Sequence, residues 1–78
     1  MYRVLFVCHG NICRSPMAEF IMKDLVEKAG LSQEIFVSSA AMTSEEIGND
    51  MYPPAKRMLT AMGVPFEKRK ARRMTKAD

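Results

Sequence analysis

The sequence predicts an α/β domain built on a parallel sheet. Three observations support this: a continuous apolar run at residues 4–7, a helical repeat of apolar residues soon after it, and a second short strand pattern at residues 34–38. A run with β-branched and aromatic members is typical of a parallel strand covered on both faces. The order strand, helix, strand forms a βαβ unit, whose crossover is right-handed in nearly all known cases.

The first helix is predicted over residues 16–29. Ser15 precedes Pro16, and this pair is typical of a helix start: a capping hydroxyl followed by a ring whose missing N–H costs nothing in the first turn. Gly30 supplies the C-terminal stop. The expected buried face consists of the apolar residues at helical spacing, Ala18, Ile21, Met22, Leu25, Val26 and Ala29.

A polar loop is expected at residues 43–50, after the second strand. Pro53 and Pro54 then open a second helix that ends at Gly63. The predicted inner face of this helix consists of Ala55, Met58, Leu59 and Met62. No third strand is predicted, because residues 66–78 are too charged for the centre of a sheet.

Length and composition indicate one soluble globular domain. The chain has 78 residues, of which 47% are hydrophobic and 27% are charged, as in typical soluble proteins. The apolar run at residues 4–8 is far shorter than the roughly 18 to 20 residues that cross a bilayer, and no secretory leader is recognisable. We therefore expect a cytoplasmic protein that does not bind membranes.

The net charge of +3 comes from the C-terminal part of the chain, because residues 67–78 contain six basic and two acidic residues. No aromatic residue is interleaved with this basic run, and no recognition-helix pattern accompanies it. A solvated charged surface is therefore favoured over nucleic-acid binding.

The chemistry is concentrated in residues 8–16, which join the first strand to the first helix. Ligands of open α/β sheets bind at the carboxyl ends of the strands, and N–H groups at a helix start favour anions. This environment, with Arg14 nearby, favours the thiolate form of Cys8. The Arg14 guanidinium offers a planar fork for two phosphoryl oxygens. Gly10 and Asn11 tolerate the positive φ of a tight loop, so the sequence predicts an oxyanion-binding loop.

Two other roles of the thiols are less favoured. An ordinary buried-core role for Cys8 and Cys13 is disfavoured, because they lie at the junction of the strand and the helix with Arg14 beside them. A zinc site made of the two cysteines and His9 lacks a fourth ligand and the usual spacing. We therefore expect no metal and no cofactor, and we place His9 at the rim of the substrate entrance.

Residues 4–19 resemble the low-molecular-weight protein-tyrosine phosphatases nearly residue for residue, around their signature C-x5-R-S-P after a hydrophobic strand. The similarity continues at residues 39–41, 53–57 and 71–75. It spans essentially the whole chain but only the first half of the family's domain. The resemblance implies a flavodoxin-like, three-layer phosphatase fold, truncated, with residues 1–78 as its N-terminal portion.

The resemblance also implies hydrolysis of phosphotyrosine proteins or small aryl phosphates through a phosphocysteine, with inorganic phosphate as product and inhibitor. Cys8 would be the nucleophile, and Arg14 would stabilise the transferred phosphoryl group. The implied phosphate-binding residues are His9, Gly10, Asn11, Ile12, Cys13, Arg14 and Ser15.

Further roles follow from the same resemblance. Asn11, Ser15 and Ser39 match polar residues that hold the loop in shape, and Ser15 is also placed to donate a hydrogen bond to the Cys8 sulfur. Cys13 matches a second thiol that can pair reversibly with the nucleophile and protect it from over-oxidation.

Two features depart from the family pattern. Arg69 stands where the family often has a histidine that supports the loop. The family's general acid, an aspartate in a late Asp-Pro motif, has no counterpart among Asp24, Asp50 and Asp78. General acid catalysis contributes about 10² to 10⁴-fold, so the resemblance implies an impaired enzyme.

Two other functions stay open. The chain can be a non-catalytic oxyanion-binding or assembly module, or a thiol protein similar to arsenate reductases, although it lacks a third cysteine for a thiol relay. A sheet that ends at the first strand also leaves an apolar edge unpaired. This predicts either that the chain is a piece of a longer phosphatase or that it forms a homo-oligomer through this edge or by swapping.

Overall fold

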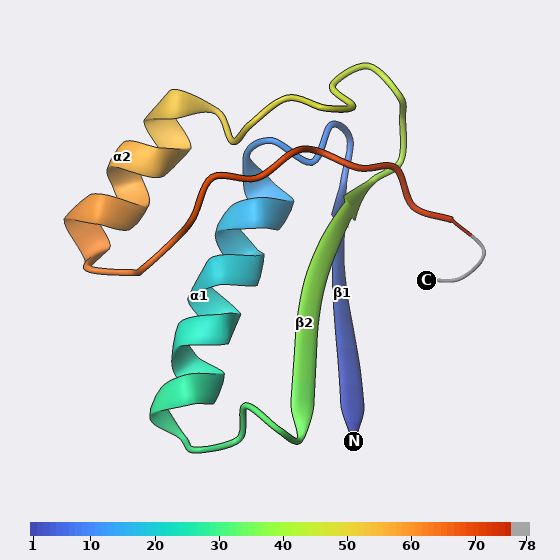
Figure 1. Cartoon of the computed structure of the whole chain (residues 1–78). Coiled ribbons are helices and arrows are strands. Elements are labelled where there is room, and N and C mark those ends of the chain that lie inside the picture. The colour runs from blue at the N-terminus through green and yellow to red at the C-terminus, as the bar shows by residue number, and fades with distance from the viewer. Residues whose placement is uncertain (76–78) are drawn as a thin grey trace.

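The computed structural model describes residues 1–75. It contains β1 (Tyr2–Cys8), α1 (Arg14–Lys28), β2 (Ile35–Ala41) and α2 (Pro53–Met62). β1 and β2 form a parallel two-stranded sheet. α1 connects the strands and lies between the sheet and α2 (Figure 1). This arrangement confirms the predicted α/β class and its βαβ unit.

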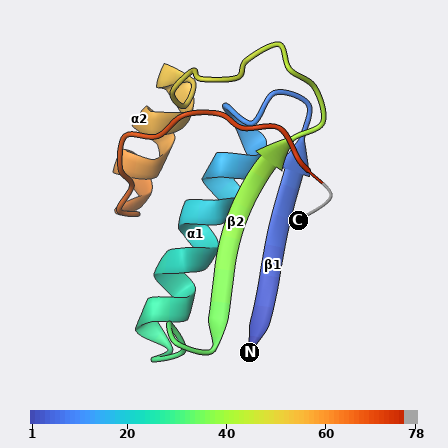
Figure 2. The same cartoon turned by 45° about the vertical axis from the view of Figure 1, so that its right-hand side comes forward.

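The turned view in Figure 2 shows both helices on the same side of the sheet. No helix of residues 1–75 covers the opposite face of the sheet. No residue of β1 is fully buried. The expectation that this strand is covered on both faces is therefore wrong for residues 1–75, because both helices lie on the same side of the sheet. Among residues 1–75, no helix is long and apolar enough to cross a membrane.

β2 continues three residues beyond the predicted end of the strand, to Ala41. The extension contains Ser39 and Ala40, residue types with weak strand preference. It forms because Phe6, Val7 and Cys8 of β1 pair with residues 39–41 in register. This extension brings the end of β2 beside Cys8.

α1 begins at Arg14, two residues before the predicted start at Pro16. The predicted cap is wrong: the residue at the N-cap position is Cys13, and no side chain caps the helix. The Ser15 hydroxyl is used inside the preceding loop instead. Pro16 still lies among the first residues of the helix, whose N–H groups have no intrahelical partner.

The core lies mainly between α1 and α2. Its buried cluster consists of Phe20, Met51, Ala55, Leu59 and Val64. The predicted faces of the helices are only partly correct, because Leu25, Ala29, Met58 and Met62 are exposed. α1 packs against the sheet and α2 at once and has no single apolar stripe, whereas α2 packs only on α1 and buries a narrow face.

The predicted ends of the helices are confirmed where they depend on local backbone preference. Pro53 and Pro54 form the first turn of α2, and Gly63 ends it with a left-handed φ of 71°. Gly30 follows α1 with a φ of 73°. Glycine adopts this conformation without the steric cost that a side chain adds.

Candidate active site

The loop of residues 9–13 joins the carboxyl end of β1 to the first turn of α1 (Figure 1). Asn11 adopts a φ of 58°, as predicted, whereas Gly10 does not have a positive φ. Gly10 serves a different purpose, because a Cβ there would lie 3.0 Å from Cγ of Glu46. A side chain at position 10 would therefore crowd the Glu46 side chain, which would have to shift by a few tenths of an ångström.

Asn11 is fully buried and uses every polar group of its side chain. Its Nδ2 donates to Ser15 Oγ at 2.7 Å and to Ser39 Oγ at 2.9 Å. Its Oδ1 accepts from the Arg72 backbone N–H at 3.1 Å and from the Arg69 guanidinium. A buried side chain with all its hydrogen bonds formed fixes the loop, because any other loop shape would leave these groups unpaired.

Ser15 connects this network to the sulfur. Its Oγ lies 3.0 Å from Cys8 Sγ, which is the contact that the family resemblance implied. Asn11 donates to the same oxygen. When Cys8 is ionised and has no proton to give, the Ser15 hydroxyl is the donor and its proton bonds the sulfur.

The Cys8 thiol ionises more readily than an ordinary thiol. Burial raises its pKa, but hydrogen bonds from the Ser15 hydroxyl and from the backbone N–H groups of Ser15, Asn11 and Gly10 outweigh it, so the pKa of Cys8 is lowered. Donors that point at a sulfur stabilise its charged form. The loop can therefore present a thiolate at the end of β1.

The other predicted phosphate-binding residues belong to the loop or to the start of α1. Arg14 is the first residue of α1 and its side chain is exposed. His9 is exposed at the rim, where its Nε2 lies 2.9 Å from Oε2 of Glu45. The Ile12 carbonyl accepts a hydrogen bond from the Tyr52 backbone N–H at 2.6 Å.

Cys13 lies on the inner side of the loop, where it packs against the core cluster. Both Cys13 and Cys8 are free thiols. Among residues 1–75, no group of three or more side chains is arranged to hold a metal ion.

The sequence did not identify the role of Glu19, which lies one helical turn after Ser15 on α1. Glu19 is 8% exposed and accepts hydrogen bonds from Ser39 Oγ and from Lys23 Nζ. Ser39, which is also buried, thereby joins α1 to β2 and to Asn11. The only signal in the sequence is the spacing of Glu19 from Ser15, which places both residues on one face of the helix.

Asp50 is occupied by structural contacts. Its carboxylate accepts from the Met51 backbone N–H at 2.7 Å, from the Arg69 backbone N–H at 3.2 Å, and from Lys56 Nζ. These hydrogen bonds, that of Lys56 first, lower the pKa of Asp50 to about 2. Asp24 is paired with Lys28 at 2.9 Å, and Asp78 lies outside the described residues. Neither Asp24 nor Asp50 is a suitable general acid.

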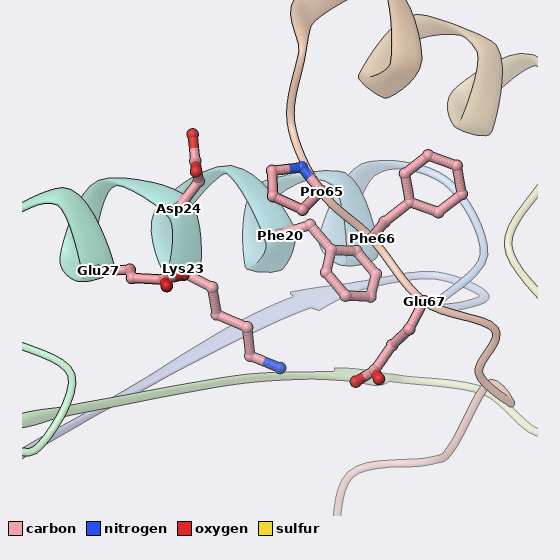
Figure 3. A pocket seen from close by; sticks show the side chains of 7 residues that line it. All are labelled: Phe20, Lys23, Asp24, Glu27, Pro65, Phe66 and Glu67. Carbon is pink, nitrogen blue, oxygen red and sulfur yellow. The ribbon is translucent and has the colours of Figure 1, made fainter.

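A cleft of about 280 Å³ lies between α1 and residues 65–67, on a different part of the molecule (Figure 3). The rings of Phe20 and Phe66 meet edge to face there, with 6.3 Å between their centroids. Lys23 and three carboxylates complete its lining: Asp24, Glu27 and Glu67. The cleft contains neither of the two cysteines and none of the residues around the Cys8 sulfur, so it is separate from the Cys8 loop.

Residues 3–78 match the model of the low molecular weight phosphotyrosine protein phosphatase family. The chain is 44% identical to the low molecular weight protein-tyrosine-phosphatase YfkJ of Bacillus subtilis, over 100% of this chain and 50% of the relative. It is 46% identical to the human low molecular weight phosphotyrosine protein phosphatase, over 96% of this chain and 47% of the relative.

Solved structures agree with these matches. The crystal structure of YfkJ superimposes with a TM-score of 0.91, over 96% of this chain and 47% of that one. A Drosophila arginine phosphatase is 38% identical, with a TM-score of 0.87 over 95% of this chain and 46% of that one. The chain thus spans about half the length of the curated relatives it matches.

Proposed function

Since the chain belongs to the low molecular weight phosphotyrosine protein phosphatase family, we propose that residues 8–15 are the catalytic loop of a phosphatase for phosphotyrosine and other aryl phosphate esters. One observation carries this proposal: the Cys8 sulfur receives hydrogen bonds from the Ser15 hydroxyl and from loop N–H groups, which favour a thiolate nucleophile.

In the proposed first step, the Cys8 thiolate attacks phosphorus. The new S–P bond forms as the P–O bond to the phenol breaks, and the bonding pair leaves with the phenolate oxygen. Arg14 and the loop N–H groups stabilise the charge on the three equatorial phosphoryl oxygens. In the second step, water attacks phosphorus, the S–P bond breaks, inorganic phosphate leaves and the thiolate is restored.

Both steps are slow without a general acid and base. Asp24 is paired on α1, and Asp50 has a pKa of about 2, so it holds no proton to give at neutral pH. A positioned acid contributes about 10² to 10⁴-fold. We therefore infer that the chain is impaired toward phenyl esters with poor leaving groups and acts best on esters of acidic phenols, whose phenolates leave without protonation.

Further parts of the proposal concern Cys13, the substrate and the location of the chain. Cys13 would form a reversible disulfide with Cys8 under oxidation. The substrates would be phosphotyrosine proteins or small aryl phosphates, and inorganic phosphate would inhibit as the product. The reaction needs no cofactor, and a reducing compartment such as the cytoplasm would keep both thiols free.

The uncovered side of the sheet supports a proposed association between copies of the chain. Within residues 1–75, β1 is hydrogen-bonded to β2 along one edge, and no strand pairs with its other edge. Val7 is 39% exposed and Phe36 on β2 is 55% exposed. An unpaired strand edge next to exposed apolar side chains is a template for pairing with another chain, so we propose that copies associate through β1 or exchange it.

A second candidate function is oxyanion binding without turnover. It is favoured because the Asp50 carboxylate is held by Lys56 and by the Arg69 N–H and does not serve as a general acid. An arsenate-reductase-like reaction is less favoured, because two cysteines do not make a three-thiol relay.

Phosphocysteine trapping separates these functions. The chain is mixed with p-nitrophenyl phosphate, quenched in acid and analysed by mass spectrometry, with Cys8→Ser as control. A phosphoryl adduct on Cys8 that is absent from Cys8→Ser supports the phosphatase. Binding of vanadate by a folded chain without any adduct favours the oxyanion module, and a folded chain that shows neither contradicts the proposal.

A further inference from the structure

The cleft between α1 and residues 65–67 lies apart from the Cys8 loop (Figure 3). Its volume of about 280 Å³ is at the lower limit of small-molecule sites, which enclose about 300 to 1,000 Å³. Phe20 is buried there and Phe66 is partly exposed, and their rings meet edge to face. The cleft therefore fits one or two side chains of a partner protein better than a compact ligand.

The aromatic rings make the cleft suitable for cations. Lys23 Nζ lies over the Phe20 ring, 5.4 Å from its centroid, which is within the range of cation–π attraction. This lysine is also held by the Glu19 carboxylate, one helical turn earlier on α1. Among residues 1–75, no cation lies over the Phe66 ring. Phe66 is therefore a partly exposed ring that can take a cation from another molecule.

The charged side chains of the cleft give it a negative charge. Its lining contains three carboxylates, those of Asp24, Glu27 and Glu67, and one ammonium group, that of Lys23. The lining thus carries a net charge of −2, although the whole chain carries +3. A cleft in which one sign of charge predominates attracts ligands of the opposite sign.

Two of these carboxylates are available to a partner. Asp24 is already paired with Lys28 at 2.9 Å. Within residues 1–75, neither Glu27 nor Glu67 forms an ion pair, and both are exposed. Figure 3 shows them on two sides of the cleft, Glu27 on α1 and Glu67 on the segment after α2. Each of them can accept a cation that comes from outside the chain.

We propose that this cleft docks a basic segment of a partner protein, with one arginine against Phe66 and Glu67 and a second basic residue at Glu27. Arginine suits the first position, because its planar guanidinium packs on an aromatic ring and bonds a carboxylate through two parallel hydrogen bonds. The compact ammonium group of lysine offers neither contact in this form. Arginine and aromatic side chains are also enriched in the cores of protein interfaces.

The test uses a capped peptide that has two arginines on either side of one leucine, so that both arginines lie on one face of an extended chain. The peptide is titrated into the ¹⁵N-labelled full chain at low salt, and the NMR shifts of the amides locate it and give its Kd. A matched peptide with citrulline in place of both arginines keeps the length of the side chains but carries no charge. We expect the arginine peptide to shift the amides of residues 23–27 and 65–67. The citrulline peptide should bind about five-fold more weakly, or weaker still.

Variants of the chain then test each contact. Glu67→Gln and Glu27→Gln change exposed residues, and each should weaken the arginine peptide about two- to five-fold, the effect of one exposed ion pair. Phe66→Leu keeps an apolar side chain without the ring and should weaken it by a similar factor of about two to five. Glu34→Gln removes the same charge at an exposed position outside the cleft, and it should bind the peptide like the wild type.

Three results would overturn the proposal: a citrulline peptide that binds as tightly as the arginine peptide, wild-type affinity in both Glu67→Gln and Glu27→Gln, or shifts at the mouth of the loop near Glu45 instead of in the cleft. Shifts of the cleft residues with chain concentration alone would also overturn it, because the occupant is then a second copy. Phosphocysteine trapping reports on Cys8 and this titration reports on the cleft, so either proposal can fail without the other.

Discussion

The Ser15 hydroxyl lies 3.0 Å from the Cys8 sulfur, although Ser15 stands where a helix-capping residue is expected. α1 therefore begins without a side-chain cap. A missing N-cap costs about 1 kcal/mol in typical proteins. The hydroxyl stabilises the Cys8 thiolate instead. The start of α1 is therefore less stable than a capped helix, while the pKa of Cys8 is lowered.

Ser15→Ala is expected to raise the pKa of Cys8. The hydroxyl is the strongest of the hydrogen-bond donors that lower this pKa, and its loss leaves only the backbone N–H groups. The pH midpoint of iodoacetamide alkylation at Cys8 should move upward. Ser38→Ala, at an exposed serine on β2, is the control. An unchanged midpoint in folded Ser15→Ala would mean that the backbone alone stabilises the thiolate.

Asn11→Ala is expected to be among the most destabilising substitutions in the chain, by about 3 kcal/mol or more. The substitution leaves the buried hydrogen-bonding partners of the Asn11 side chain without a partner. Each unsatisfied buried polar group costs about 1–3 kcal/mol. Urea unfolding measures the loss. Asn11→Gly loses the same hydrogen bonds but relieves the backbone strain at a φ of 58°. It should therefore be the more stable of the two variants, and the reverse order would contradict this account.

The free energy of unfolding should fall with acid because of Asp50. Its pKa is lowered from 3.8 to about 2 in the folded chain, so the unfolded state binds a proton first as the pH drops. The stabilisation is present above about pH 5 and is lost progressively toward about pH 2. Asp50→Asn should flatten this part of the stability curve. If the stability curves of the wild type and of Asp50→Asn are parallel between these pH values, the lowered pKa of Asp50 is not the cause of the acid dependence.

The uncovered sheet face should make the mass of the chain in solution depend on its concentration. Val7→Lys places a charge on β1 next to the unpaired edge, and charged residues there oppose strand pairing. Light scattering after gel filtration should show a larger mass for the wild type than for Val7→Lys. Leu31→Lys, an exposed apolar residue beyond α1, serves as control. A wild type that stays monomeric at all concentrations would contradict association through β1.

The sequence predicted correctly what depends on residues near one another in the chain. The end of β1, the reactive loop and the start of α1 follow one another directly, so the position of Cys8 beside the helix N-terminus needed no tertiary information. The left-handed Asn11 and the glycine after each helix also follow from local backbone preference. Helix faces were harder to predict, because which side is buried depends on the neighbours of each helix.

Only the tertiary structure shows how the loop is held. Glu19, Ser39 and Arg69 meet Asn11 or its partners from a helix, a strand and a distant segment. The family resemblance implied that Ser39 supports the loop and placed Arg69 at a supporting position, but it gave no role to Glu19. Neither hydrophobic periodicity nor spacing indicates that these polar side chains lie close together. Burial of polar groups becomes favourable only when all partners are in place. The reactive residue was therefore fixed by local sequence, and the network that stabilises its charge was decided by folding.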